Sequence, residues 1–309
     1  MRALTLHGPR QAALVEVDDP SPGAGEVVVR VRSCGVCGSD LNAWQGVRGI
    51  QYPLPPGAPG HETLGEVVAL GPEVASLRVG ETVTGLMWNG FAELGVARAE
   101  DLVGLPPPLA SSGVLGEPLA CAMNVVRRSA ISAGDRIAIV GFGYLAALVV
   151  QLLPRHVAGW LAVSRREDSR ALALRLGAEA AYDFAHVPAE LWDSFAVVIE
   201  AAGVQQTLDY ATWLTTYGGR LVIAGYHADG PRTVNMQSWN WKGIDVINAH
   251  ERDPSVYVSA LHEALALVQA RPLALERLET HAWPLEQAAE AFRVAEERPS
   301  GFVKGVVQP

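Results

Sequence analysis

Two short segments of the chain carry side chains that can bind a metal ion. Cys37 lies close to Ser39 and Asp40, and His61 and Glu62 follow further along the chain. Zinc binds thiolate, imidazole and carboxylate ligands, and a catalytic zinc keeps one coordination position open. The sequence therefore predicts one metal centre built on Cys37 and His61. Its carboxylate would come from Glu62 or from the later Glu117.

The pair Cys34-x-x-Cys37 has two other interpretations, a redox dithiol and half of a structural zinc knuckle. A redox pair should open a helix in a thioredoxin-like unit, and the sequence shows no such unit. A knuckle needs a second cysteine pair, but Cys121 is the only other cysteine. We therefore expect Cys34 and Cys121 to be small buried residues.

A glycine-rich turn further along the chain predicts a dinucleotide site. Gly141-x-Gly143-x-x-Ala146 follows an apolar run at 136–140 and opens a helical pattern. Gly141 permits the tight turn, Gly143 lets a pyrophosphate approach the backbone, and the small Ala146 permits close packing of helix and strand. The N–H groups of the helix start would face the phosphates. The expected cofactor contacts are Gly141, Gly143, Tyr144, Leu145, Ala201, Gly225 and Tyr226.

The end of the next predicted strand favours NADP(H) over NAD(H). Enzymes that prefer NAD usually place Asp or Glu here to bind the ribose 2′-hydroxyl. This chain has Ser164, Arg165 and Arg166 instead. One hydroxyl and two guanidinium groups suit a 2′-phosphate.

The elements that must position these residues form two predicted domains. Short Val-rich runs with many Gly and Pro residues precede about residue 110, which indicates a strand-rich domain. Strands expected at 136–140, 159–163, 195–199, 220–224 and 244–247 alternate with helices at 145–153 and 169–176, which predicts a parallel sheet. Helices near 256–269 and 285–296 and a closing strand at 302–307 should fold back onto the first domain. The predicted domains are 1–125 with 265–309, and 126–264.

Composition narrows the classes of partner. The 309 residues carry a formal net charge of −9, whereas nucleic-acid binding needs clustered Lys and Arg. No apolar run approaches the roughly 20 residues that span a bilayer, and the first residues lack the apolar core of a signal peptide. We expect a cytoplasmic protein with a small-molecule substrate and with neither nucleic acid nor membrane as a partner.

Together the motifs resemble one family. Their order is similar to that of the zinc-dependent medium-chain dehydrogenases, and the Glu-Pro-Leu segment looks most like the polyol and threonine dehydrogenase branch. The resemblance covers essentially the whole chain. It implies an α/β protein with a GroES-like, β-rich catalytic domain and a Rossmann domain with a doubly wound parallel sheet. The motifs that carry it are Cys37-Gly38-Ser39-Asp40, Gly60-His61-Glu62, Glu117-Pro118-Leu119, Gly141-x-Gly143 and Gly301-Phe302-Val303-Lys304.

The resemblance also implies a role for each site residue. Cys37 and His61 would bind zinc, and Glu62 would be a ligand or exchange on and off the metal. Glu117 would be a ligand or hold the zinc-bound water. Ser39 would take the proton of the substrate hydroxyl, and Asp40 would orient His61.

The chain departs from the family at two places. Residues 85–93 cross the position where many members carry a four-cysteine zinc lobe, so no structural zinc is expected. Asn42 replaces a histidine that often continues the proton path, and an amide cannot carry a proton as imidazole does. By analogy, Trp44 and Trp88 would line the substrate pocket, the substrate would be a polyol, sugar, cyclitol or amino alcohol, and the protein would be a homodimer or homotetramer.

Two alternatives stay open at this point. One is a metal-free reductase of quinones or enones on the same fold, although such relatives lack the Cys and Gly-His-Glu ligands. The other is a nucleotide-binding protein without catalysis, which the intact set of candidate catalytic residues disfavours.

Overall fold

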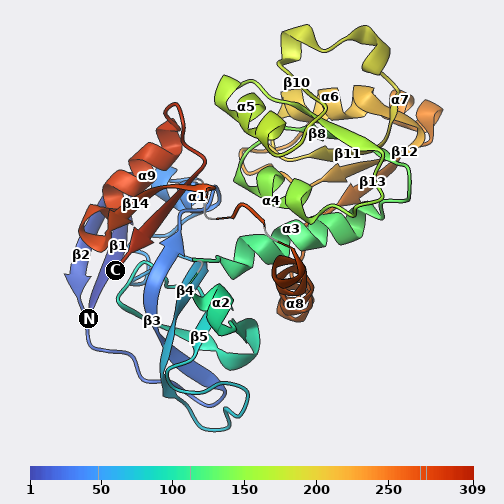
Figure 1. The fold of residues 1–309 in the computed structure, drawn as a ribbon. Coiled ribbons are helices and arrows are strands. Elements are labelled where there is room, and N and C mark those ends of the chain that lie inside the picture. The colour runs from blue at the N-terminus through green and yellow to red at the C-terminus, as the bar shows by residue number, and fades with distance from the viewer. Residues whose placement is uncertain (48, 112, 272, 276) are drawn as a thin grey trace. The chain divides into compact units, whose positions relative to one another are not determined.

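The computed structural model describes residues 1–47, 49–111, 113–271, 273–275 and 277–309. The chain divides into two compact units (Figure 1). The first unit comprises Met1–Ala120 and Asp253–Pro309, and the second comprises Cys121–Arg252.

A seven-stranded sheet forms the centre of the first unit, with the strand order β14-β15-β3-β4-β5-β7, and β6 also pairs with β3. A separate hairpin joins β1 to β2. The strands of the first unit are β1 Arg2–Gly8, β2 Gln11–Glu16, β3 Glu26–Gly35, β4 Glu62–Leu70, β5 Thr82–Leu86, β6 Leu94–Arg98, β7 Leu102–Gly104, β14 Glu279–Pro284 and β15 Lys304–Gln308. Its helices are α1 Asp40–Gln45, η1 Ala99–Asp101, α2 Pro107–Ala110, α8 Pro254–Ala270, η4 Leu285–Gln287 and α9 Ala288–Glu297, while α3 Gly116–Ser129 contains the first boundary between the units.

The C-terminal strand is part of this sheet, as the sequence predicted. β15 runs antiparallel to β3, and Val306 and Val307 pair with Gly35 and Cys34. These strands share an apolar core with α9, whose buried face includes Phe292. The pairing brings the last strand of the chain beside the segment that leads to Cys37.

Helix α8 belongs to the first unit, whereas the predicted boundary between residues 264 and 265 falls inside this helix. The physical reason is its packing. α8 contacts η1, β5 and β7 of the first unit, and it buries one apolar face. That face consists of Ala260, Leu261, Ala264 and Leu265.

The second unit is a six-stranded parallel sheet with helices on both faces (Figure 1). Its order, β10-β9-β8-β11-β12-β13, is the doubly wound order of dinucleotide-binding folds, in which the chain changes direction between β8 and β11. The strands are β8 Arg136–Val140, β9 Gly159–Val163, β10 Ala180–Tyr182, β11 Phe195–Glu200, β12 Thr215–Ile223 and β13 Asp245–Asn248. The helices are α4 Tyr144–Leu152, α5 Glu167–Arg175, η2 Phe184–His186, η3 Ala189–Leu191, α6 Gln205–Leu214 and α7 Met236–Lys242.

The predicted alternation of strands and helices is confirmed in this unit. The predicted strands at 136–140 and 159–163 coincide with β8 and β9, and the others lie within a few residues of β11, β12 and β13. The apolar side chains of β8, β9 and β11 are almost wholly buried because helices cover both faces of a parallel sheet. The short strand β10 was not predicted, since its three residues are only half-buried and carry no strong pattern.

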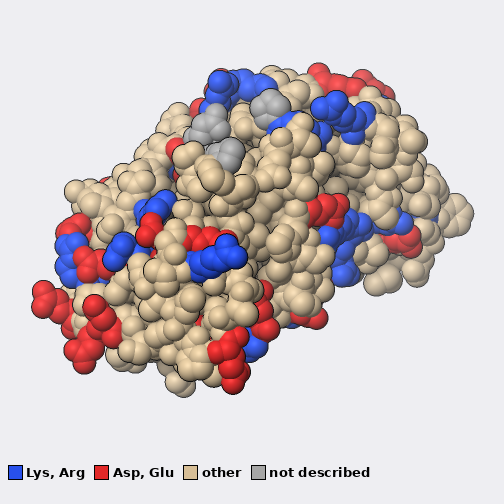
Figure 2. Space-filling model, turned by 60° about the horizontal axis from the view of Figure 1, so that its bottom comes forward, with Lys and Arg blue, Asp and Glu red and all other residues tan. Residues whose placement is uncertain are grey.

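No helix in the described part of the chain is long and apolar enough to cross a membrane. On the face shown in Figure 2, basic and acidic side chains lie in small mixed groups. This face therefore shows no extended basic surface of the kind that binds a phosphate backbone.

Thr84 ties three elements of the first unit together and provides a test of their packing. Its hydroxyl donates to the carbonyl of Thr63 and accepts from the N–H of Gly116, both at 2.7 Å, and Thr84 is 1% exposed. Replacing Thr84 by Val should lower the free energy of unfolding by about 1–3 kcal/mol, because both backbone groups lose a buried partner. Denaturant unfolding measures the loss. Thr84→Ser keeps the hydroxyl and is the control, and equal stability of the Val and Ser variants would contradict this assignment.

Candidate metal centre and nucleotide site

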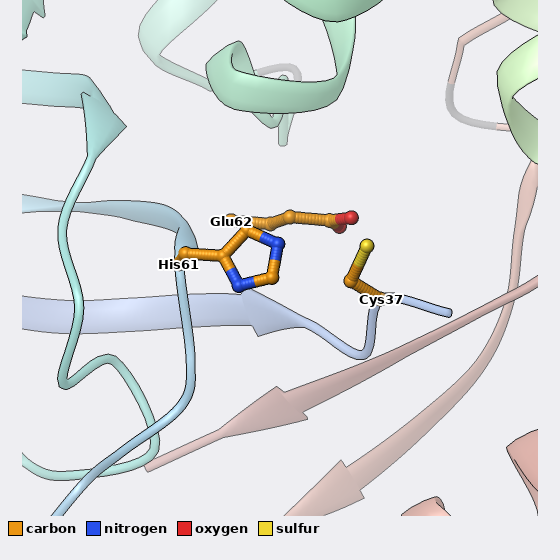
Figure 3. Close-up of side chains that lie close together, drawn as sticks. All are labelled: Cys37, His61 and Glu62. Atoms are coloured by element: carbon orange, nitrogen blue, oxygen red, sulfur yellow. The ribbon is translucent and has the colours of Figure 1, made fainter. Parts of the chain in front are cut away.

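The first unit brings Cys37, His61 and Glu62 together (Figure 3). One possible ligand atom from each of these residues lies within 4.8 Å of the others. Cys37 follows β3, and His61 and Glu62 stand at the start of β4, which pairs with β3. Two neighbouring strands therefore deliver all three side chains to one place.

Asp40 organises this cluster from the first turn of α1. The carboxylate is wholly buried, accepts a hydrogen bond from the backbone N–H of Cys37 at 2.8 Å, and lies 3.1 Å from Nδ1 of His61. With Nδ1 held toward Asp40, the other ring nitrogen of His61 is turned toward Cys37 and Glu62 (Figure 3). This arrangement agrees with the orienting role predicted for Asp40.

The protonation of the cluster reflects its burial. Burial and the Glu62 carboxylate raise the pKa of the Cys37 thiol, although His61 and Lys304 oppose them. Burial lowers the pKa of His61, but attraction to Asp40 and to Cys37 outweighs burial and sets this pKa well above its usual value. A thiol and an imidazole must both be deprotonated to bind a metal, so metal binding here would release protons.

This donor set fits zinc. A thiolate, an imidazole and a carboxylate are ligands that zinc accepts, and three protein ligands leave a fourth position for water or substrate. The described residues contain no other such group of three His, Cys, Asp or Glu side chains. Cys37 and His61 would hold the ion, and Glu62 is the carboxylate within reach.

Glu117 lies outside this group. It stands in the first turn of α3 and faces a small cavity lined by Asp101 and by Tyr257 of α8, among others. Of the two carboxylates that the sequence offered as a ligand, the structure brings only Glu62 to Cys37 and His61.

Ser39 lies at the exposed edge of the cluster, with its hydroxyl 3.4 Å from Nε2 of His61. Trp88 is 63% exposed, and its ring centroid lies 5.8 Å from that of His61. Trp44 is 5% exposed, packs against Phe292 and donates to Glu296, which gives it a packing role.

The remaining cysteines form no disulfide. Cys34 is fully buried, as expected, and its sulfur lies close to Gly60 and Gly90, where a β-carbon would clash with it. Cys121 is only half-buried, so the expectation of a buried residue was wrong for this cysteine.

Lys304 is a charged neighbour of the cluster that the sequence did not predict. Its side chain is 4% exposed, forms an ion pair with Oε2 of Glu62 and donates to the carbonyl of Val36 at 3.0 Å. Burial lowers the pKa of Lys304, but Glu62 and Cys37 outweigh burial and raise it. A lysine at the start of an apolar strand was the available signal. Gly35 leaves room for the pair, since a β-carbon there would meet both Glu62 and Lys304.

In the second unit, the glycine-rich turn has the predicted geometry. Gly141 adopts a left-handed φ of 87° directly after β8, and Gly143 precedes the first residue of α4. A β-carbon on Gly141 would clash with Ala202, whereas one on Gly143 would meet nothing within 4 Å. The turn therefore needs glycine at the first position for its backbone and leaves open space at the second.

The other predicted cofactor residues lie at the same edge of the sheet, where the carboxyl ends of its parallel strands meet. Ser164 follows β9 and is buried, while Arg165 is exposed and has no ion-pair partner in the described part of the chain. Arg166 lies 3.8 Å from Asp168. Tyr144 and Leu145 begin α4, Ala201 follows β11, and Gly225 and Tyr226 follow β12.

A buried network that was not predicted joins two of these loops. Glu200, at the end of β11, is fully buried and lies 3.2 Å from Nε2 of His227. Nε of Arg232 donates to Nδ1 of His227 at 2.8 Å, so His227 donates to Glu200 through Nε2. Arg232 also donates to the carbonyl of Gly203. The loops after β11 and β12 are thereby fixed to each other.

Two family models match the chain. Residues 23–126 match the alcohol dehydrogenase GroES-like domain, and residues 145–269 match the zinc-binding dehydrogenase domain. A sorbitol dehydrogenase of Halalkalibacterium halodurans is 27% identical, over 94% of this chain and 95% of its own length.

Solved structures have the same fold over the whole chain. A zinc-binding dehydrogenase of Sinorhizobium meliloti 1021, bound to NADP, is 26% identical with a TM-score of 0.86, covering 100% of this chain and 99% of the other. For the 2R,3R-butanediol dehydrogenase of Bacillus subtilis the identity is 25% and the TM-score 0.85, with the same coverage. These matches confirm the predicted GroES-like and Rossmann architecture and do not favour a metal-free reductase or a non-catalytic protein. The chain belongs to the zinc-dependent medium-chain dehydrogenase/reductase family of alcohol dehydrogenases and is an oxidoreductase.

Proposed function

We propose that this protein is a dehydrogenase with a single, catalytic zinc that transfers hydride between NADP(H) and a secondary alcohol or its ketone, with a polyol or sugar alcohol as the substrate class. The proposal rests mainly on the cluster of Cys37, His61 and Glu62, with His61 oriented by Asp40. The polyol class is supported by the similarity to a sorbitol dehydrogenase, and aldehydes, cyclitols and amino alcohols remain in the substrate screen described below.

Bound zinc would supply a Lewis acid that polarises the substrate oxygen. The residues of the chain have separate tasks around it. Asp40 fixes the ring of His61, and Lys304 balances the charge of Glu62. The exposed hydroxyl of Ser39 beside His61 is placed to accept the proton of the alcohol. Asn42 cannot relay that proton onward, so it leaves through water or the cofactor ribose.

The cofactor assignment uses the residues after β9. Arg165 is exposed without an ion-pair partner among the described residues, and no carboxylate stands at 164–166 to bind a ribose 2′-hydroxyl. The NADP-bound relative supports this choice. Gly141, Gly143 and the start of α4 would hold the pyrophosphate.

Two further properties are part of the proposal. β13 is an edge strand of the second sheet, which suits pairing with a second copy, so we propose a homodimer or homotetramer. The three cysteines form no disulfide, which suits a reducing compartment and favours the cytoplasm.

A substrate screen tests the proposed reaction as a whole. The purified, zinc-loaded protein is assayed with polyols, sugars, cyclitols, amino alcohols and simple secondary alcohols, with NADP⁺ and NAD⁺, and with the matching ketones and aldehydes in reverse. Turnover of a polyol with NADP⁺ is the expected result. Reduction of quinones or enones without metal, or no turnover of any alcohol or carbonyl, would exclude the proposal.

Removal of a single ligand tests the metal centre. Cys37→Ala and His61→Ala should each lose bound zinc and turnover, because two remaining ligands hold the ion weakly. Elemental analysis of the purified variants measures the zinc. Cys121→Ala is the matched control and should keep its zinc, since it lies outside the cluster. Full activity in a zinc-free variant would refute the assignment.

Replacing Arg165 tests the cofactor preference. Arg165→Ala should lower kcat/KM for NADPH by about 10- to 100-fold, the value of one hydrogen bond between charged groups. The value for NADH should change little, because NADH lacks the 2′-phosphate. Arg175→Ala, on the exposed end of α5, is the control. Equal losses with both cofactors would contradict the assignment.

A further inference from the structure

Lys304 is a buried cation that depends on its counter-charge. It is 4% exposed and forms its ion pair with Glu62, which is 2% exposed. An ammonium group removed from water loses several kcal/mol of solvation, and only close opposite charge offsets this loss. The charged state of Lys304 therefore depends in part on whether the Glu62 carboxylate is bound to another cation.

Glu62 has a second possible partner, since it is also the carboxylate of the metal cluster. A carboxylate bound to a dication shares its negative charge with that ion, so its attraction for a neighbouring ammonium is weakened. When Glu62 turns to a metal, Lys304 loses part of its counter-charge while remaining buried.

A second carboxylate lies beside Lys304. β14 and β15 are parallel, and Glu279 stands opposite Lys304 in their register. Glu279 is half-buried, with Oε2 lying 3.8 Å from the position that a β-carbon on Gly113 would occupy. Within the described ranges of the chain, Glu279 has no hydrogen-bond or ion-pair partner.

The charges around Glu279 are those of the metal cluster. Burial raises the pKa of Glu279 to about 7, while Lys304 lowers it and Glu62 raises it. Cys37 and Asp40 also raise the pKa of Lys304 by their charges. In the metal-free protein, the Glu279 carboxyl therefore carries its proton up to about neutral pH.

We propose that Glu279 is a reserve counter-ion for Lys304, which takes over this cation when Glu62 binds the metal and thereby strengthens metal binding. The inference rests on the metal centre of the proposed function, but it concerns a positioning residue that does not touch the metal. Glu279 gives its proton to solvent when the metal binds, because Lys304 then attracts the carboxylate more strongly.

The sign of the pH dependence follows from this exchange. Below about pH 7 the metal-free protein holds a proton on Glu279, and metal binding must displace it. Above that pH the carboxylate is already ionised and supports Lys304 fully. Glu279 therefore strengthens metal binding most on the alkaline side of neutrality, in addition to the deprotonation of Cys37 and His61.

The test is the zinc affinity of the full chain, measured by competition with a chromogenic chelator from about pH 6 to about pH 8, a range that spans the titration of Glu279. Glu279→Gln should bind zinc about tenfold more weakly at the alkaline end, which corresponds to one unit of pKa. The difference from the unchanged protein should close toward the acid end, where glutamine resembles the protonated carboxyl. Glu100→Gln, on the exposed surface of the same unit, should match the unchanged protein.

A second pair of variants separates this role from ordinary packing. In a Lys304→Met background, Glu279→Gln should no longer change zinc affinity, because the cation that it serves is absent. Glu279→Asp keeps the carboxylate, so its zinc affinity should follow that of the unchanged protein across the pH range. This variant also tests the inference if Glu279→Gln does not fold. In thermal unfolding at about pH 6, the metal-free Gln variant should be no less stable than the unchanged protein, because a carboxyl whose pKa is raised by burial costs stability above its unfolded pKa.

Three outcomes would overturn the inference: equal affinities at every pH, a loss that does not depend on pH, and a loss that persists in the Lys304→Met background. These measurements use neither substrate nor cofactor. A protein that binds zinc as described but turns over no alcohol would refute the proposed function alone. If the protein is active but Glu279→Gln leaves its zinc affinity unchanged, only this inference is refuted.

Discussion

Glu62 and Lys304 are both almost wholly buried, and each provides the charge that the other requires. The pair joins β15, the last strand of the chain, to β4 across β3, the strand that leads to Cys37. Its position depends on β15 pairing with β3, which sets Val306 against Gly35. Without that strand the cluster would lose its cation, and three acidic groups (Cys37, Asp40 and Glu62) would face each other with only His61 to balance them.

Small residues make room for this concentration of charge. A β-carbon on Gly35 would occupy the space of the ion pair, and one on Gly60 or Gly90 would strike the sulfur of Cys34. Cys34 belongs to the apolar core, so the core packs directly against the backbone at Gly60 and Gly90. The cluster is therefore built by close approach of backbone segments, and its specificity depends on residues that carry no charge.

The sequence predicts the buried strands and the metal ligands well, but it predicts the boundary between the two units less well. Apolar runs of four or five residues located β8, β9 and β11, because strands buried on both faces leave a continuous signal. The motifs named Cys37, His61 and Glu62 as ligands, and the strand pairing brings them together. The limits of α8 were predicted closely, but the domain boundary was placed inside it, because a helix after the last parallel strand has an apolar face that either unit could bury.

Partners distant in the sequence were beyond the reach of local patterns. Lys304 reaches Val36 and Glu62 only through the pairing of the first unit's sheet, and no spacing rule connects residues 62 and 304. Glu279 enters through the register of β14 with β15, which a single sequence does not specify. Motifs thus identify the residues that can hold a metal, while the residues that balance its charge come from topology.

Two buried carboxylates show how differently such charges can be used. Glu200 accepts hydrogen bonds from the N–H groups of Ala202 and Gly203 and from the Thr207 hydroxyl, in addition to His227. A carboxylate that accepts from four donors would lose all of these hydrogen bonds if it moved, which suits a fixed junction between cofactor loops. Glu62 is as deeply buried, but Lys304 is its one ion-pair partner among the described residues. The oxygens of Glu62 accept fewer hydrogen bonds, so Glu62 loses less energy than Glu200 would when it changes partner. This difference in hydrogen bonding makes Glu200 a structural anchor and Glu62 a candidate ligand.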